Sequence, residues 1–138
     1  MLTLLITGAA SGIGAGLAKE LARAGHHIIV SDLQQRDCQV VADQIRHAGG
    51  SADALALDVT SDASVASAFS SLPRPIDVLI NDAGLQHVAP LEDFAMSKWD
   101  YLVQVMHAQT IASVRSRKSG TLTPIAAAGT RPKSDSTE

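Results

Sequence analysis

Short apolar runs alternate with amphipathic segments along the chain as far as about Met106. The apolar runs have the length of buried strands, and the segments between them repeat apolar side chains at helical spacing. The predicted strands are Leu2–Ile6, His27–Ser31, Asp53–Leu57 and Ile76–Ile80, and the predicted helices are Gly12–Ala24, Asp37–Ala48, Asp62–Leu72 and a segment that begins at Ser97. Repeated strand–helix units predict an α/β fold with a doubly wound parallel sheet. With strand order 3-2-1-4, a ligand crevice lies between strands one and four at their carboxyl ends.

The helical spacing also predicts which side chains face the core. On the first helix the apolar face holds Ile13, Leu17, Leu21 and Ala24. On the last helix it holds Trp99, Leu102, Val103 and Met106. Ser97 and Asp100 have the spacing of a capping box, with aspartate in the place of glutamate, so Ser97 is the expected N-cap of the last helix.

Beyond about Met106 the apolar periodicity is lost. Residues 115–120 form a polar, basic stretch that is more typical of a solvated linker than of an anion-binding patch. The nine residues from 130 to 138 contain no apolar side chain except Pro132, and they bury too little surface to offset the entropy of ordering them. Residues 1–106 are therefore the predicted domain, and residues 107–138 are a predicted irregular, poorly ordered tail.

A glycine-rich turn joins the first predicted strand to the first predicted helix. Gly8, Gly12 and Gly14 follow Thr7 with the spacing G-x-x-x-G-x-G. The first glycine suits a tight turn, the second lets the main chain approach a pyrophosphate, and the third lets the helix pack closely. The N–H groups that open the helix lack internal acceptors and lie at the positive end of its dipole, which favours a phosphate. A turn without any ligand is the alternative.

A carboxylate follows the second predicted strand. Asp32 lies near the position at which an acid would accept hydrogen bonds from both hydroxyls of an adenosine ribose. Its charge would repel a ribose 2′-phosphate, so the sequence favours NAD over NADP as the cofactor. Arg36 is a counter-argument, but it lies four residues further on. A turn or helix-capping aspartate is the alternative.

These features, together with two further motifs, resemble the short-chain dehydrogenase/reductase family. Thr7–Gly14 is similar to its cofactor loop, Asp58-Val59 to its adenine-contacting pair, and Asn81-Asp82-Ala83-Gly84 to its Asn-Asn-Ala-Gly motif, with Asp82 in the place of an asparagine. Within the family, residues 83–94 and 98–100 resemble the bacterial 3-hydroxybutyrate dehydrogenases. The resemblance covers residues 1 to about 105 and implies a Rossmann-like fold.

The resemblance also implies ligand contacts. The dinucleotide-binding residues would be Gly8, Ser11, Gly12, Ile13, Gly14, Asp32, Asp58, Val59, Asn81, Ala83 and Gly84. Asp58 would accept from the adenine amino group, although an acid in the turn before a helix is the alternative there. Gln86 would contact the carboxylate of a small 3-hydroxy acid, and His87 is expected to be a loop histidine without a catalytic role. The implied reaction moves a hydride between NAD and that acid.

The catalytic groups of the family have no counterpart in this sequence. The family uses a Tyr-x-x-x-Lys pair, a serine and an asparagine, with the tyrosine as general acid and base. The single tyrosine, Tyr101, is followed four residues later by Val105, and Met106 stands where the family has its asparagine. We therefore expect a truncated chain with no catalytic residue and no turnover. A non-catalytic dinucleotide-binding module and a fragment without function are the alternatives.

Composition narrows the remaining possibilities. A net charge of −3 gives no case for nucleic acid or an anionic membrane. No apolar run has the length of a membrane span and no secretion signal is evident, so a cytoplasmic location is expected. Because Cys38 is the single cysteine, an intrachain disulfide is excluded. Cys38 is expected to have no functional role, although its position near the start of a helix could lower the pKa of its thiol.

Two further expectations concern metals and assembly. None of the five histidines has metal-ligand spacing to a second ligand, so no metal site is expected. A fifth strand would normally cover strand four, so this strand is expected to be an apolar edge that can pair with another chain. The tetramer that the family resemblance would imply is not expected.

Overall fold

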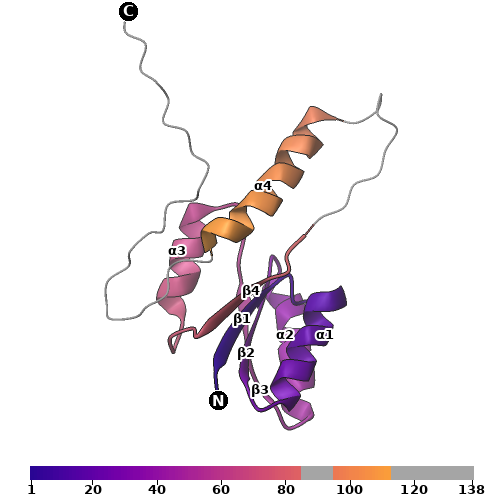
Figure 1. Cartoon of the computed structure of the whole chain (residues 1–138), viewed down its shortest axis with the longest axis vertical. Helices are drawn as coiled ribbons and strands as arrows, with labels where there is room; N and C mark the ends of the chain where they lie inside the picture. The colour runs from indigo at the N-terminus through magenta and orange to yellow at the C-terminus, as the bar shows by residue number, and fades with distance from the viewer. Residues whose placement is uncertain (85–94, 113–138) are drawn as a thin grey trace, which may run out of the picture.

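The computed structural model describes residues 1–84 and 95–112, and four parallel strands form its sheet (Figure 1). The strands are β1 (Thr3–Thr7), β2 (His27–Asp32), β3 (Ser51–Ala56) and β4 (Val78–Asn81), and the helices are α1 (Gly12–Arg23), α2 (Gln35–His47), α3 (Asp62–Ser71) and α4 (Met96–Ala112). The strand order is β3-β2-β1-β4, which confirms the predicted α/β, Rossmann-like topology. The predicted limits of these elements are within two residues of the observed ones, except at the end of α4.

The register of the sheet gathers the carboxyl ends of the strands. Thr7, the last residue of β1, lies opposite Ser31 of β2 and opposite Asn81 of β4. The main chain keeps this pairing beyond the strand, because the Ala9 N–H donates to the Ser31 carbonyl at 2.9 Å. The segments that follow β1, β2 and β4 therefore start at one edge of the sheet, where predicted ligand groups can converge.

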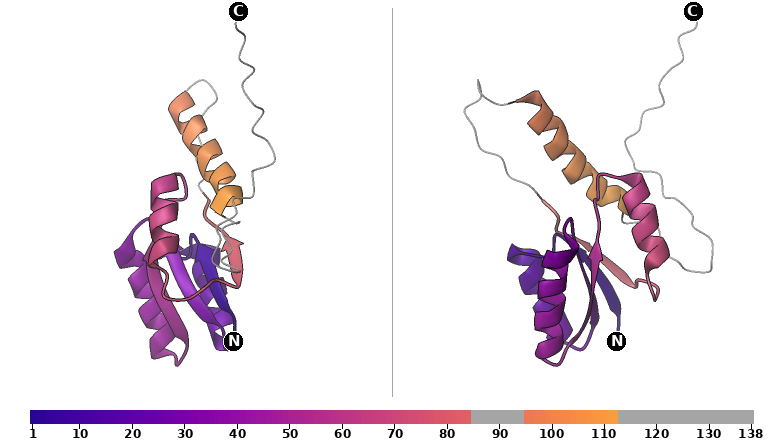
Figure 2. Two further views of the ribbon diagram at one scale, coloured as in Figure 1. Left: turned by 90° about the vertical axis from the view of Figure 1, so that its left-hand side faces the viewer. Right: turned by 180° about the vertical axis from the view of Figure 1, so that it is seen from behind.

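Small side chains let α1 and α2 lie close to one face of the sheet (Figure 2). The buried side of α1 consists of Gly14, Ala15, Ala18 and Ala22. The predicted inner face of this helix is wrong at Ile13, which is 80% exposed, and at Ala24, which is exposed and is the C-cap residue. Leu17 and Leu21 are only partly buried at the margin of the core. Close approach of a helix to a sheet selects small side chains on the helix, so size and apolarity alone do not identify the inner face.

The other face of the sheet has α3 on its side (Figure 2). Leu5 and Ile29 alternate along their strands with the residues that face α1 and α2, and both are almost fully buried. The helix α4 buries few of its side chains. Val105 is its one buried side chain in the described part of the helix, whereas the predicted inward residues Trp99 and Val103 are exposed. The predicted inner face of α4 is therefore wrong at those two positions, and the side chain of Met106 lies outside the described residues.

Both ends of α4 differ from the prediction. The helix begins at Met96, and the N–H groups of Lys98 and Trp99 donate to the Ala95 carbonyl at 2.9 and 3.2 Å. Ser97 is therefore inside the first turn and does not act as the N-cap. At the other end the helix continues to Ala112, so residues 107–112 are helical and the predicted domain limit at residue 106 falls within a helix. The rest of the predicted tail, residues 113–138, lies outside the described residues.

The outer edges of the two edge strands, β3 and β4, differ in whether neighbouring groups cover them. Side chains of α2 satisfy the outer edge of β3: the Arg46 guanidinium donates to the Ala52 carbonyl at 2.9 Å, and the Gln35 amide accepts from the Ala56 N–H at 2.7 Å. Within the described residues no strand or side chain covers the outer edge of β4, where Val78 is 38% exposed. Pairing of this edge with another chain remains a prediction.

Cys38 is a buried thiol in the core between α2 and the sheet. Burial, reinforced by the nearby charge of Asp32, raises the pKa of the Cys38 thiol to about 11. The expectation that the helix start could lower this pKa is therefore wrong, because desolvation of the thiolate dominates. A thiol with this pKa is a poor nucleophile at neutral pH. No helix in the described part of the chain is long and apolar enough to span a membrane.

A buried histidine joins β2 and β3 at the end of the sheet opposite the strand carboxyl ends. His27 is 2% exposed, and its ring lies between Ser51 Oγ at 2.6 Å and Asp53 Oδ2 at 3.1 Å. Because a carboxylate only accepts hydrogen bonds, Nε2 carries the proton and Nδ1 accepts from the Ser51 hydroxyl. Burial lowers the pKa of His27, with the charge of Arg74 acting in the same direction, and Asp53 opposes them only in part. His27 is therefore neutral in the folded protein near pH 7.

This lowered pKa predicts acid sensitivity. The unfolded chain binds a proton at His27 near the ordinary pKa of 6.5, and the folded chain binds it only at lower pH. The stability that neutral His27 supports is complete above 6.5 and is lost as the pH falls below that value. We expect the free energy of unfolding to fall between pH about 7.5 and about 5.5, and His27→Gln to flatten that slope while costing about 1–2 kcal/mol at the higher pH. Urea unfolding at several pH values measures both effects.

The matched control is His47→Gln, because His47 is an exposed histidine on α2. It should leave the slope as in the unmodified chain. A His27→Gln slope equal to that of the control would contradict the assignment of a buried, neutral His27.

Candidate functional site

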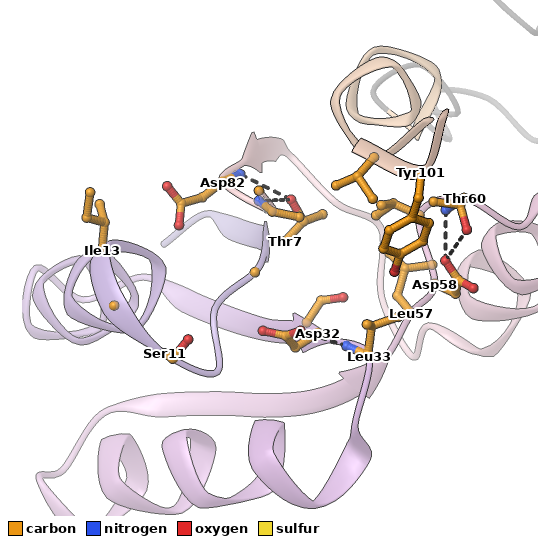
Figure 3. A pocket seen from close by; sticks show the side chains of 17 residues that line it. Thr7, Ser11, Ile13, Asp32, Leu33, Leu57, Asp58, Thr60, Asp82 and Tyr101 are labelled. Carbon is orange, nitrogen blue, oxygen red and sulfur yellow. Dashed lines mark hydrogen bonds between the residues drawn. The ribbon is translucent and has the colours of Figure 1, made fainter. Parts of the chain in front are cut away.

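One pocket opens at the carboxyl edge of the sheet, with a volume of about 410 Å³ (Figure 3). Its walls come from the segments after β1, β2, β3 and β4, and from one face of α4. Nine of the predicted cofactor-binding residues line it: Gly8, Ser11, Gly12, Ile13, Asp32, Asp58, Val59, Ala83 and Gly84. The structure thus brings together residues that are up to 76 positions apart in the sequence (84 − 8 = 76).

Two predicted residues of the described part of the chain are not in the wall of this pocket. Gly14 is buried at the start of α1, and Asn81 is the exposed last residue of β4. Gln86, the predicted substrate contact, lies outside the described residues, as does His87.

Two glycines give the loop after β1 its shape. Gly8 has φ of 67° and Gly12 has φ of 57°, a region of backbone conformation that other residues rarely adopt. At Gly8 space is short as well, because a Cβ there would lie 2.7 Å from the Cα of Ala83. The loop after β1 therefore touches the segment after β4 at a point where no side chain can be accommodated.

Gly14 fixes how α1 meets this loop. A Cβ at Gly14 would lie 2.5 Å from the Gly8 carbonyl oxygen and 2.7 Å from Oδ2 of Asp82. The sequence predicted that Gly14 lets the helix pack on the strand. In the structure the close partners are the loop carbonyl and the Asp82 carboxylate, so Gly14 sets the position of the helix start relative to the pocket.

The start of α1 can receive an anion. Ser11 is the N-cap residue with an extended backbone, yet its side chain makes no capping hydrogen bond, and the first turn contains no acidic residue. The N–H groups of the first turn therefore have no capping side chain. The positive end of the helix dipole faces the pocket beside Ser11 and Gly12. Such an arrangement fits the oxygens of a pyrophosphate without any charged side chain.

Asp32 is held in a fixed orientation at the end of β2. Its Oδ2 accepts from the Ala10 N–H at 3.2 Å, and its Oδ1 accepts from the Leu33 N–H at 2.8 Å. Asp32 can therefore stabilise the turn and bind a ligand at the same time, because each of its carboxylate oxygens keeps a further lone pair. A carboxylate fixed in this way is preorganised to accept from a pair of ribose hydroxyls.

Asp58 also has a structural role. Its Oδ1 accepts from both the N–H and the hydroxyl of Thr60, at 2.9 and 2.6 Å, and its own N–H donates to Ser64 Oγ at 3.0 Å. These bonds fit the alternative of an acid in the turn before α3. Oδ2 accepts no hydrogen bond from the described residues, so one oxygen remains for a donor in the pocket.

Sequence reasoning missed Thr7, Ser31 and Tyr101. Thr7 Oγ1 accepts from the N–H groups of Asp82 and Ala83, at 3.1 and 3.2 Å, and so ties the end of β4 to β1 (Figure 3). Thr7 directly precedes the first glycine of the motif, and this position was the sequence feature that could have identified it. Ser31 is 1% exposed, and its hydroxyl has no partner among the described residues. Tyr101 lines the pocket from α4, four residues before Val105 and so on the same helix face.

Negative side chains dominate the polar part of the pocket. Asp32, Asp58 and Asp82 all line it, and Figure 3 shows Asp82 on the side of Ile13 and α1, across from Asp58. Among the residues that the structure describes, no lysine, arginine or histidine lines the pocket. Among the described residues no group of three histidine, cysteine or acidic side chains is placed to hold a metal ion. The pocket therefore offers main-chain N–H groups to an anion and carboxylates to hydroxyl or amino donors.

Comparison with known proteins supports this interpretation. The sequence profile of the family described as short chain dehydrogenase matches residues 2–117. The chain is 42% identical over 105 residues to the uncharacterised oxidoreductase YxjF of Bacillus subtilis, covering 74% of this chain and 41% of that protein. It is 37% identical over 102 residues to the gluconate 5-dehydrogenase of Gluconobacter oxydans, covering 72% of this chain and 40% of that protein.

A solved structure gives the same result for the fold. The gluconate 5-dehydrogenase of Burkholderia cenocepacia, in complex with NADP and tartrate, has a TM-score of 0.72 and 36% identity, over 79% of this chain and 44% of that one. The chain thus spans about two fifths of the length of these relatives. They support the expected family. They do not support the expected likeness to 3-hydroxybutyrate dehydrogenases, because their names point to gluconate or to no substrate.

The tight fit at Gly14 predicts a large effect of one methyl group. Gly14→Ala would place its Cβ against the Gly8 carbonyl and the Asp82 carboxylate, and we expect a loss of about 1–3 kcal/mol of stability. Gly16→Ala is the matched control on the same helix, because a Cβ there meets nothing within 4 Å. That variant should gain about 0.5–1 kcal/mol from helix propensity. Thermal unfolding compares the two, and equal effects would contradict the observed approach of α1 to the loop.

Proposed function

The chain belongs to the short-chain dehydrogenase/reductase family, and from that premise we propose that it binds NAD in the pocket at the carboxyl edge of its sheet. The pyrophosphate would lie at the start of α1, held by main-chain N–H groups around Ser11 and Gly12. The positive φ of Gly8 and Gly12 supports this placement, because it gives the loop a tight shape and leaves open space beside Gly12, where a ligand can approach the main chain.

Asp32 is the observation that carries the choice of NAD. Its carboxylate is fixed by two main-chain N–H groups and lines the pocket, so it can accept from both hydroxyls of the adenosine ribose. The same charge disfavours a 2′-phosphate, and Arg36 does not line the pocket and so does not offset it. The solved relative from Burkholderia cenocepacia holds NADP, so the preference is a proposal for this chain alone.

Substitution of Asp32 tests the proposal. Asp32→Ala should weaken NAD binding by about tenfold or more, because a carboxylate–hydroxyl bond contributes about 1.5–3 kcal/mol. The same change should leave NADP binding equal or stronger, so the two affinities converge. Isothermal titration of the 138-residue chain with each dinucleotide measures both.

The matched control is Asp43→Ala, which removes one negative charge from α2, outside the pocket wall. It should leave both affinities unchanged. Undiminished NAD binding by Asp32→Ala would rule out the ribose role of Asp32, and no NAD binding by the unmodified chain would remove the proposed function.

The reaction class follows from the family. When bound, the nicotinamide accepts a hydride from the carbon of a secondary alcohol. The resemblance at residues 83–94 points to a 3-hydroxy acid, and the relatives' names point to gluconate. Both are hydroxylated carboxylic acids, and we propose that class of substrate, with Gln86 as the contact for its carboxylate. A neutral amide can donate to an anion without the desolvation penalty of a buried cation.

A second candidate is a binding module that does not turn over substrate. Tyr101 favours it, because the single tyrosine of the sequence lies in the pocket wall on the side of Asp58 and has valine, not lysine, four residues later. Tyr101 thus lacks the lysine with which the tyrosine of a Tyr-x-x-x-Lys pair acts in proton transfer. Proton transfer from the alcohol then has no assigned acceptor among the described residues.

A turnover assay separates the two candidates. With NAD and either D-3-hydroxybutyrate or gluconate, we expect the 138-residue chain to form no NADH above the level of a protein-free control. Formation of NADH at an ordinary enzymatic rate would establish the dehydrogenase and exclude the binding module. No turnover together with NAD binding would establish the binding module, and no turnover without binding would leave a fragment without function.

A further inference from the structure

We infer that Tyr101 stacks its ring on the adenine of the bound dinucleotide and thereby decides the affinity for the adenine half. This inference rests on the proposed NAD site and adds a residue to it. Tyr101 is the single tyrosine of the chain and is not placed as a general acid or base. Its side chain points from α4 into the pocket, toward the region of Leu33 and Leu57 (Figure 3).

The surroundings of Tyr101 fit a flat, uncharged ring. Leu33 is 49% exposed and Tyr101 is 39% exposed, and both line the pocket. Leu57 and Val105, which line the same pocket, are 3% and 5% exposed and form its closed apolar side. Leu33 and Tyr101, from two separate segments, thus remain partly uncovered beside the buried Leu57 and Val105, which is typical of a binding site for an apolar or aromatic group.

The edge of such a ring also has partners. Asp58 keeps its Oδ2 free of hydrogen bonds within the described residues, and this oxygen can accept from the exocyclic amino group of adenine. Val59 follows it in the pocket wall and can present its main chain to the ring nitrogens. A phenol ring on the face and a carboxylate at the amino edge are together selective for an aminated purine.

The position of Tyr101 along the pocket separates it from the phosphate end. In Figure 3 it lies on the side of Asp58 and Thr60, whereas Ser11 and Ile13 lie at the other side with α1. Asp32 lies between these two groups of residues. Phosphate, ribose and base would therefore follow one another from α1 to α4, and Tyr101 would contact the base and not the charged part of the ligand.

Binding of dinucleotide fragments by the 138-residue chain tests this role. Tyr101→Leu should weaken binding of AMP and of NAD by about tenfold, which is the size expected for loss of one base–aromatic stack. Tyr101→Phe should bind both nearly as the unmodified chain does, because it keeps the ring. Nicotinamide mononucleotide lacks adenine, and its affinity should be equal in all three proteins.

The control on the same helix is Val103→Ala, since Val103 is exposed and does not line the pocket. It should leave all affinities unchanged, and circular dichroism should show α4 intact in every variant. AMP binding by Tyr101→Leu at the unmodified affinity would overturn the inference while leaving the NAD site in place. An equal loss in the Phe and Leu variants would also overturn it. If the unmodified chain bound neither NAD nor AMP, the proposed function itself would fail.

Discussion

The contact between the loop after β1 and the segment after β4 is the constraint on which the rest of the site depends. Thr7 Oγ1 accepts from the N–H groups of Asp82 and Ala83, and the absence of a side chain at Gly8 lets Ala83 approach. Without these bonds two partly buried N–H groups would lose their acceptor, and removal of such groups from water without a partner is costly. The same contact brings Asp82 against Gly14 and so places the start of α1 at the pocket. Strand order, helix position and pocket shape thus meet in one small cluster at the carboxyl ends of β1 and β4.

The two faces of the sheet divide structural support from ligand contact. Alanines on α1 and the apolar side of α2 close one face with a continuous core, and α2 also satisfies the free edge of β3 through Arg46 and Gln35. The other face carries Thr7, Ser31 and His27 among its buried residues, and α4 joins it at the pocket. Polar side chains in the floor of a sheet need partners, and the unpaired hydroxyl of Ser31 shows that the described protein groups do not supply all of them. One face is therefore packed by a continuous apolar core, and the other face holds an unpaired hydroxyl next to the proposed ligand pocket.

The elements and the strand order could be predicted from the sequence because short, largely apolar runs alternate with segments of helical length, as repeated strand–helix units do. The loop after β1 and Asp32 were also within reach, since glycine spacing and a strand-terminal acid depend on local backbone geometry. The inner faces of α1 and α4 were not. Periodicity favours large apolar side chains such as Ile13 and Trp99, whereas close approach of a helix to a sheet selects alanine and glycine. Thr7 and Tyr101 were missed for a different reason, because their contacts join segments that lie far apart in the sequence.

The charge of the pocket gives a physical basis for what the proposed ligand must be. Within residues 1–84 and 95–112, three carboxylates and no cation line the cavity, and the net charge of the chain is −3, so long-range electrostatics oppose an anion. Attraction for a pyrophosphate has to come from the few N–H groups at the start of α1, whose effect fades within one turn. Each further phosphate would meet only carboxylates, whereas hydroxyl and amino groups of a ribose or a purine would meet acceptors. The described part of the pocket is therefore suited to a ligand with a single, compact anionic centre and neutral donors on one side of it, and this distribution of charge acts in the same direction as Asp32 in the proposed preference for NAD.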